Sequence, residues 1–196
     1  VEDYPIQVGE PGPEEELDFG DAPDPSYPSL LASNGARHDR TPGDIQLIHL
    51  GPNVDVEPDS NQVDADAYDD GVVFLGSGDP GGPYAMPFVA GTEGAVDVEV
   101  TNGRGTVCAW FDWNQDSSWT VDETVFCTLL PAGTHQLTFT VPSDALLGPT
   151  YVRFRLAEGN TAPTGYVRNG EVEDYEVLVE GTPPPPPPVG GMTEPL

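Results

Sequence analysis

Apolar residues recur at every second position in several short segments of this 196-residue chain, and this period constrains the fold more than any other feature. Successive side chains of a β-strand point to opposite faces, so the period predicts strands with one buried face. The alternation is found in residues 96–101, 136–141, 152–156 and 174–179. Four further apolar runs are predicted strands: Gln46–Leu50, Val72–Leu75, Val107–Phe111 and Val125–Leu129.

The breaks between these segments are as informative as the segments themselves. The chain has 23 Gly and 23 Pro residues, which favour turns and leave little room for helices. We expect at most one helical turn, at Ser143–Leu147. Many short strands with frequent turns predict an all-β fold, an antiparallel β-sandwich of the Ig-like or jelly-roll type. Arg153 and Arg155 alternate with apolar residues and are therefore expected on the solvent face of their strand.

The charge of the chain is strongly one-sided. It has 34 Asp and Glu residues against six basic residues, all of them Arg, for a formal net charge of −28. Such a polyanion repels phosphate backbones and anionic lipids, so we expect neither nucleic-acid binding nor a polybasic membrane anchor. No run approaches the roughly 20 apolar residues of a membrane-spanning helix, so direct membrane insertion is not expected either. Divalent cations are the more natural partners.

Cys108 and Cys127 are the only two cysteines. A pair of this kind usually forms a disulfide in a secreted chain, whereas in a reducing cytosol two such cysteines are usually buried thiols. The acidic, lysine-free composition rich in Gly and Pro favours an extracellular or cell-surface location, and with it the disulfide. No signal peptide opens the sequence, so an exported protein would be represented here by its processed form or by an excerpt.

The N-terminal residues repeat a segment found near the other end. Val1-Glu-Asp-Tyr4 is identical to Val172-Glu-Asp-Tyr175, and the apolar alternation continues beyond the repeat. The apolar face of the first segment consists of Tyr4, Ile6 and Val8, and Val1 is a further candidate assembly contact. Residues 1–8 are thus either the last strand of a preceding homologous domain or a strand donated to a neighbouring subunit.

Proline-rich segments flank the predicted sandwich. Residues 9–16 read as an acidic linker, and residues 181–196 contain a run of six prolines typical of polyproline II. This run consists of Pro183, Pro184, Pro185, Pro186, Pro187 and Pro188. It is either a stiff spacer to a neighbouring domain or a surface for self-assembly. We therefore expect four parts, namely an extra strand (1–8), a linker (9–16), the sandwich (17–180) and a tail (181–196).

One short motif has the spacing of a calcium-binding loop. Oxygen-bearing side chains occupy positions 1, 3, 5, 7 and 12 of a twelve-residue segment, which is the ligand spacing of helix-flanked calcium loops. These residues are Asp112, Asn114, Asp116, Ser118 and Glu123. Ser117 stands where such loops have Gly for a sharp turn, and the flanking segments read as strands. The alternative is a hairpin loop, rich in Asp and Asn, that binds no metal.

Two further groups of acids are candidate cation sites. The first precedes the predicted strand at Val72 and consists of Asp55, Glu57, Asp59, Asp64, Asp66, Asp69 and Asp70. Seven like charges repel one another unless cations lie among them, although most charge runs are simply solvated loops. The second group would join Asp18, Asp21 and Asp24 to Glu171, Glu173 and Asp174, if the first and last strands are neighbours.

Other residue types give weaker indications. Trp113 and Trp119 lie in the 112–123 loop and are candidate glycan contacts if exposed, whereas Trp110 is in phase with a strand and is expected in the core. The three histidines have no spacing that suggests zinc. No nucleophile, phosphate-loop or metalloprotease motif is present, and we expect no enzymatic activity.

Four motifs together resemble a known family. Asp18-Phe-Gly-Asp-Ala-Pro-Asp24, Gly35-Ala-Arg-His38, Asp112-Trp-Asn114 and Gly170-Glu-Val-Glu-Asp-Tyr175 are similar to motifs of the GEVED domain, a module of large secreted and cell-surface bacterial and archaeal proteins. The resemblance implies a β-sandwich with acidic loops suited to calcium and no catalytic activity of its own. The extra strand and the proline tail depart from a simple module and favour a polymer subunit.

The sequence therefore predicts a non-enzymatic extracellular structural subunit, stabilised by calcium. Its expected partners are copies of itself or homologous neighbouring domains, joined head to tail into a surface fibre or repeat array by strand donation from residues 1–8. The alternative is a carbohydrate-binding or adhesive module of a larger secreted protein.

Overall fold

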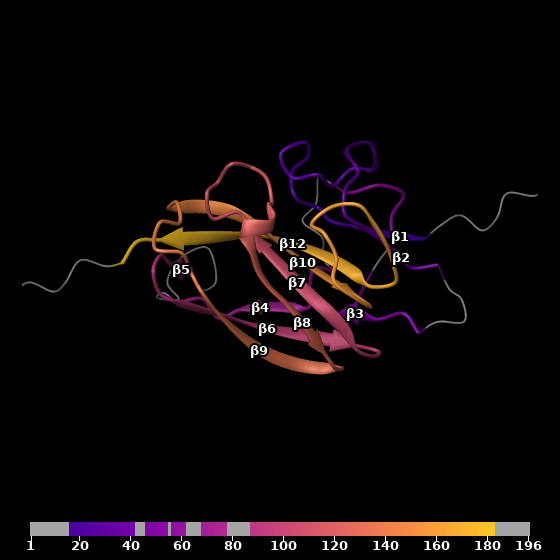
Figure 1. Cartoon of the computed structure of the whole chain (residues 1–196). Helices are drawn as coiled ribbons and strands as arrows, with labels where there is room; N and C mark the ends of the chain where they lie inside the picture. The colour runs from indigo at the N-terminus through magenta and orange to yellow at the C-terminus, as the bar shows by residue number, and fades with distance from the viewer. Residues whose placement is uncertain (1–15, 42–45, 55, 62–67, 78–86, 183–196) are drawn as a thin grey trace, which may run out of the picture.

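A computed structural model of the chain describes residues 16–41, 46–54, 56–61, 68–77 and 87–182 (Figure 1). Within these residues the strands are β1 (Leu17–Phe19), β2 (Arg37–Asp39), β3 (His49–Leu50), β4 (Val72–Phe74), β5 (Phe88–Val89), β6 (Glu93–Thr101), β7 (Gly105–Phe111), β8 (Thr124–Leu130), β9 (Gly133–Thr140), β10 (Gly148–Ala157), β11 (Tyr166–Arg168) and β12 (Glu171–Glu180). Two single turns of 3₁₀ helix, η1 (Leu31–Ser33) and η2 (Val121–Glu123), complete the elements.

Two large sheets form the body of the fold. The five-stranded sheet has the order β5-β12-β10-β7-β8, and the four-stranded sheet is built around β6, which pairs with β3, β4 and β9. Figure 1 shows the strands of the two sheets as two layers facing each other. The prediction of an all-β sandwich is thus confirmed. The eight segments predicted as strands from their apolar pattern overlap β3, β4, β6, β7, β8, β9, β10 and β12.

The core lies between the two sheets, where the alternating apolar residues meet. Val96, Val98 and Val100 of β6 are each at most 1% exposed, as the period of two requires. They belong to a cluster with Phe111 of β7 and Phe154 of β10. Each large apolar side chain buried in this way stabilises the fold by about 1.5–3 kcal/mol, so the alternation fixes which face of each strand turns inward.

A small third sheet, β1-β2-β11, was not predicted. Each of its strands has three residues, too few for a period of two to be recognisable. The pairing of β2 with β11 is parallel, as is the short pairing of β5 with β12, so the sandwich is not wholly antiparallel. In place of a helix, the segment Ser143–Leu147 begins with a single turn, in which the N–H of Ala145 donates to the carbonyl oxygen of Pro142 at 3.2 Å.

The prediction that Arg153 and Arg155 lie on a solvent face is wrong, because both residues are 0% exposed. Their face of β10 is covered by loops, and carbonyl oxygens of these loops accept hydrogen bonds from both guanidinium groups. Arg153 donates hydrogen bonds to the carbonyl oxygens of Pro28 and Pro163, at 2.9 and 2.8 Å. Arg155 likewise donates to carbonyl oxygens of the loop that precedes β11, including those of Ala162, Thr164 and Gly165.

His38 of β2 completes this buried polar layer. Its Nε2 accepts a hydrogen bond from Arg155 Nε at 3.0 Å, and its Nδ1 lies 3.0 Å from the carbonyl oxygen of Asn169. Burial and the charge of Arg155 lower the pKa of His38 well below 6.5. The imidazole is therefore neutral, with its proton on Nδ1, and its role is structural.

The described strands run from Leu17 to Glu180. The predicted extra strand with Val1, Tyr4, Ile6 and Val8, and the proline run 183–188, lie outside the described residues. None of the helical segments in the part that the structure describes has the length and apolar character needed to cross a membrane.

Candidate metal centre

The connection between β7 and β8 is held at its base by a disulfide. Cys108 and Cys127 lie directly opposite each other on the two strands and are bonded, which confirms the predicted pair. The two cysteines are 19 positions apart in the sequence. Closing a loop of this length reduces the entropy of the unfolded chain and stabilises the fold by about 3 kcal/mol. The loop at residues 112–123 therefore begins and ends on two covalently joined strands.

Asp112, at the start of this loop, is 0% exposed and organises the residues that follow. Its Oδ1 accepts a hydrogen bond from the backbone N–H of Asp116 at 3.1 Å, and its Oδ2 accepts one from that of Ser117 at 3.0 Å. The hydroxyl of Tyr27, far away in the sequence, donates to the same Oδ2 at 2.5 Å. One carboxylate thus folds the loop and attaches it to the N-terminal part of the domain.

Ser117 occupies the position at which calcium loops commonly have Gly. It adopts the left-handed conformation, with a φ of 66°, so the sharp turn is formed here without Gly. This conformation costs a residue with a Cβ roughly 1–2 kcal/mol. The hydrogen bond that Ser117 donates to Asp112 helps to offset this cost, so the missing Gly does not rule out the loop geometry that a cation needs.

Glu123 closes the loop from the other side, at the end of η2. Its Oε2 accepts hydrogen bonds from the backbone N–H and the hydroxyl of Thr120, at 2.9 and 3.1 Å, in a capping box. Glu123 is only 6% exposed, and its Oε1 is a buried oxygen for which the described residues supply no hydrogen-bond partner.

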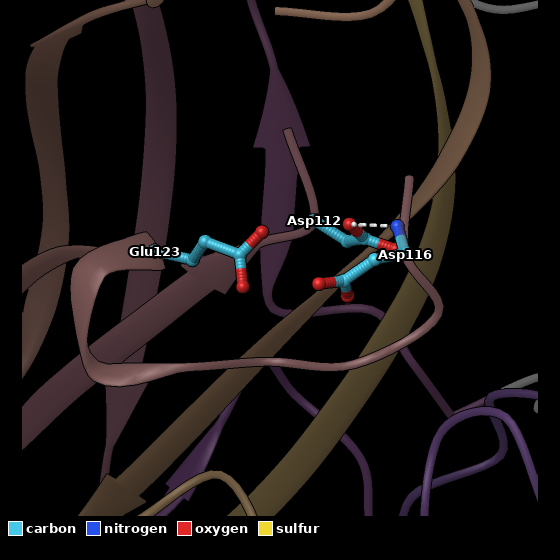
Figure 2. Close-up of side chains that lie close together, drawn as sticks. All are labelled: Asp112, Asp116 and Glu123. Carbon is cyan, nitrogen blue, oxygen red and sulfur yellow. Dashed lines mark hydrogen bonds between the residues drawn. The ribbon is translucent and has the colours of Figure 1, made fainter. Parts of the chain in front are cut away.

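The carboxylates of Asp112, Asp116 and Glu123 converge. Figure 2 shows the Glu123 carboxylate directed toward the two aspartates. Each of the three residues contributes one oxygen, and these oxygens all lie within 4.8 Å of one another. Calcium contacts its oxygen ligands at about 2.3–2.6 Å, so two ligands of one ion can be up to about 5 Å apart. The spacing of these oxygens therefore suits a hard cation of this size.

The electrostatics of the group also favour a cation. Burial raises the pKa of Glu123, and the negative charges of Asp112 and Asp116 raise it further, against the hydrogen bonds from Thr120. Three carboxylates in this arrangement repel one another, and oxygen-only donors of this kind suit calcium or magnesium rather than softer metals. The expected ligands Asn114 and Ser118 are engaged within the loop. Asn114 Oδ1 accepts from Asp116 N at 2.8 Å, and Ser118 Oγ donates to Asp116 Oδ1 at 2.7 Å.

The described acids of the segment before β4 form hydrogen bonds within the chain and do not converge on one point as the loop acids do. Asp55, Asp64 and Asp66 fall outside the described residues. Each of the remaining four acids accepts a hydrogen bond from another part of the chain. Glu57 accepts from Phe19 N at 2.8 Å, Asp59 from Leu31 N at 2.7 Å, Asp69 from Asp174 N at 3.2 Å and Asp70 from Asn53 Nδ2 at 2.7 Å. These carboxylates attach a segment with little regular structure to the sheets.

The acids of the Gly170–Tyr175 motif serve the same purpose at the start of β12. Glu171 Oε2 accepts from Leu50 N at 2.5 Å, and Glu173 Oε1 accepts from Gly71 N at 2.8 Å. These bonds join β12 to β3 and to the start of β4, both of which belong to the opposite sheet. The two glutamates are 2% and 0% exposed. Burial raises the pKa of both of them, for Glu173 to about 8.

The aspartates proposed to share an ion with this motif are also engaged. Asp18 Oδ2 accepts from Val172 N at 2.9 Å, and Asp21 Oδ1 accepts from Ser60 Oγ and from Asn61 N. Asp174 forms a buried ion pair with Arg153, in which both carboxylate oxygens lie 2.6 Å from guanidinium nitrogens. Among the residues described, close convergence of acids on one point is found only at Asp112, Asp116 and Glu123.

Trp113 and Trp119 are both buried, so the condition for glycan contacts at these residues is not met. Trp113 is 7% exposed and stacks on Phe111 in the main core, with ring centroids 4.7 Å apart. Trp119 is 8% exposed and packs on Tyr27, while the Arg153 guanidinium lies 4.4 Å from its ring. The loop folds back onto both sides of the five-stranded sheet, and this arrangement leaves no sequence signal. Trp110 is buried, as predicted.

Comparison with known proteins agrees with the motifs. Residues 106–178 match the family model of the GEVED domain. This segment runs from β7 to β12 and contains the 112–123 loop, the disulfide and most of the five-stranded sheet. No curated protein and no solved structure matches the chain significantly. The resemblance seen in the sequence is therefore confirmed for residues 106–178, which contain two of its four motifs, Asp112-Trp-Asn114 and Gly170-Glu-Val-Glu-Asp-Tyr175.

Proposed function

We propose that the chain is a non-enzymatic extracellular structural module whose 112–123 loop binds a calcium ion, and that it associates with copies of itself or with homologous neighbours. The observation that carries the calcium site is the Glu123 carboxylate. Its Oε1 is buried without a hydrogen-bond donor from the described residues and belongs to a side chain that faces two further carboxylates.

A cation removes two costs at once. A buried acceptor without a partner costs about 1–3 kcal/mol, and the three like charges add repulsion. A calcium ion bound by Asp112, Asp116 and Glu123 supplies the missing partner and neutralises the charges. Because Asp112 is also bonded to Tyr27, the ion would fasten η2 and β8 to β7 and to the N-terminal part of the domain. The ion's role is structural.

The competing explanation is a proton held between Glu123 and one of the aspartates. Calorimetric titration of calcium into the full chain at pH 7.4, a pH at which calcium competes well with protons, distinguishes the two. We expect saturable binding to the wild-type chain and binding weakened at least about tenfold in Glu123→Gln. Gln keeps the capping box with Thr120, so the loop should still fold.

Asp122→Asn is the matched control, because it removes one exposed negative charge next to Glu123 without touching the group. Its calcium affinity should stay within about twofold of wild type. Equal binding by wild type and Glu123→Gln, or no binding by wild type, would refute the site.

The extracellular part of the proposal is supported by the disulfide and by the GEVED match. Disulfides persist in oxidising surroundings and are rare in the cytosol.

Self-association is supported by the edges of the sheets. In the described residues β9 pairs with β6 and with no other strand, and residues 133–140 contain neither Pro nor an acid, Lys or Arg. Exposed edges are usually protected by such residues, so β9 is open to strand addition. At the start of β12, by contrast, the N–H groups of Val172 and Asp174 are bonded to the carboxylates of Asp18 and Asp69. We therefore assign β9 as the acceptor of residues 1–8 of a neighbour.

Sedimentation velocity over a wide range of concentrations tests this assembly. The full chain should associate, and a variant in which residues 1–8 are replaced by a Gly/Ser sequence of equal length should associate much more weakly while unfolding at the same temperature. Association that is unchanged by the replacement would overturn strand donation. The carbohydrate-binding alternative required Trp113 and Trp119 to be exposed. Both are buried, and we do not favour this alternative.

A further inference from the structure

An uncharged pocket lies on the outer face of the five-stranded sheet, on the side of β7 and β8. Its volume is about 510 Å³. The principal lining residues are Trp110, Trp119, Val121, Thr124, Asn160 and Pro163. None of the residues that line it carries a charge, although the chain as a whole has a net charge of −28. A ligand for this pocket is therefore selected by shape, apolar contact and a few hydrogen bonds.

Two nearly buried tryptophans form the floor of the pocket, so a ligand there meets only a small part of each ring. Trp119 contacts both Tyr27 and the Arg153 guanidinium, and its Nε1 donates to the carbonyl oxygen of Tyr151 at 3.3 Å. Trp110 is 2% exposed and packs in the same cluster. At the rim Val121 is 83% exposed, the highest value among the large apolar residues that the structure describes. An apolar floor and an exposed apolar rim favour an uncharged ligand that covers apolar surface.

The hydrogen-bonding groups at the rim narrow the choice of ligand. Asn160 offers a side-chain amide, and Thr124 and Thr161 offer hydroxyl groups. Polyproline has carbonyl acceptors and no N–H donors, so it needs only donors from its binding site. Proline-rich segments in the polyproline II conformation are commonly recognised by grooves lined with aromatic rings, because the preformed helix loses little entropy on binding.

The chain itself contains such a segment. Residues 181–193 are free of charge and include the six prolines 183–188. In a polyanion this is the kind of segment that can approach another copy with the least electrostatic repulsion. Six residues of polyproline II extend about 19 Å, roughly two turns of the helix. We propose that the pocket on β7 and β8 binds the proline run 183–188 of a second copy of this chain.

The strand register argues for a second copy rather than the same chain. Trp110 of β7 pairs with Arg153 of β10, and Arg153 pairs with Asp174 of β12. The pocket floor therefore lies beside Asp174, which is six residues before the end of β12 at Glu180. That distance is about 20 Å along the strand. Only Gly181 and Thr182 separate the strand from the prolines, so a stiff run would have to reverse at once to reach its own pocket.

This inference rests on the proposed self-association and adds a second contact to it, independent of β9. The test is the titration of a synthetic peptide with the sequence of residues 183–193 into the full chain at low concentration, followed by tryptophan fluorescence. We expect saturable binding, and no binding of a peptide in which alanines replace the six prolines. No response to the proline peptide would overturn the proposal, as would equal binding of the two peptides.

Two matched substitutions locate the binding site. Ala162→Asp places a carboxylate at the pocket rim, where covering prolines would desolvate it, and should weaken peptide binding at least about fivefold. Ala132→Asp makes the same change at an exposed turn between β8 and β9 and should leave the affinity within about twofold. Equal affinities of the two variants would overturn the assignment to this pocket. The assignment would also be overturned if the pocket bound an oligosaccharide and not the peptide, with oligosaccharide binding lost in Ala162→Asp.

The two assembly contacts can fail separately. If the variant with residues 1–8 replaced still binds the proline peptide, the pocket assignment is supported even where strand donation is refuted. Ala162→Asp should also reduce the concentration-dependent association of the full chain. Association unchanged by Ala162→Asp would show that the second copy does not use this pocket.

Discussion

Replacing Arg153 by Met should be among the most destabilising single changes in this domain. Met has a similar length and no charge, so the substitution removes the guanidinium and leaves its partners in place. Asp174 loses two contacts of 2.6 Å, and the side chains of the pair are 0% and 1% exposed. The carbonyl oxygens of Pro28 and Pro163 also lose their donor.

The magnitude follows from these losses. Removing one partner of a buried ion pair costs about 3–5 kcal/mol, because the other charge is left buried without compensation. Two carbonyl groups without a donor add about 1 kcal/mol or more each where water cannot reach them. We therefore expect a loss of about 5–7 kcal/mol, against a total stability of about 5–15 kcal/mol for a domain of this kind.

Urea denaturation in saturating calcium measures this loss, with the exposed Arg168→Met as the control for the loss of one positive charge. The control should change the free energy of unfolding by no more than about 0.5 kcal/mol. In a double-mutant cycle, adding Asp174→Asn to Arg153→Met should cost less than Asp174→Asn costs alone, since the two residues form one pair. A loss of less than about 1 kcal/mol in Arg153→Met would refute the argument that this pair holds the loops on the sheet.

Three further outcomes are expected. Burial raises the pKa of Glu173 from 4.5 to about 8, so the folded chain keeps a proton that the unfolded chain releases. The free energy of unfolding should therefore fall between about pH 4.5 and 8, and Glu173→Gln should reduce that slope in denaturation series at several pH values. Tyr27→Phe removes a hydrogen bond to the buried Asp112 carboxylate and should cost about 1.5–3 kcal/mol in urea, with weaker calcium binding. Reduction of the Cys108–Cys127 bridge should lower stability by about 3 kcal/mol, and an unchanged urea midpoint would contradict its clamping role.

The sequence indicated the long strands because their two faces differ in polarity. It failed where a buried face is itself polar. On β12, Glu171 and Glu173 continue the same face as Val177 and Val179, and all four are buried. Extending that alternation backward would have placed both glutamates inside the fold. For Arg153 no such signal exists, because only the covering loops decide whether its face of β10 meets solvent.

The candidate metal centre was predictable in part. The spacing from Asp112 to Glu123 placed three carboxylates together, because a loop between two paired strands returns to its starting point. The contribution of Tyr27 was not predictable, since it reaches Asp112 across 85 positions in the sequence through tertiary packing alone. The burial of Trp119 depends on the same packing.

The most direct test of the calcium site is the thermal unfolding midpoint, Tm, as a function of calcium concentration for wild type, Asp122→Asn and Glu123→Gln. An ion that binds only the folded chain stabilises it by RT ln(1 + [L]/Kd), about 2.7 kcal/mol at 100 times Kd. The Tm of wild type and Asp122→Asn should rise steadily with the logarithm of calcium concentration, while that of Glu123→Gln stays nearly constant over the same range. A wild-type Tm that does not move between excess chelator and millimolar calcium, or an equal rise in all three proteins, would contradict a structural calcium ion in the 112–123 loop.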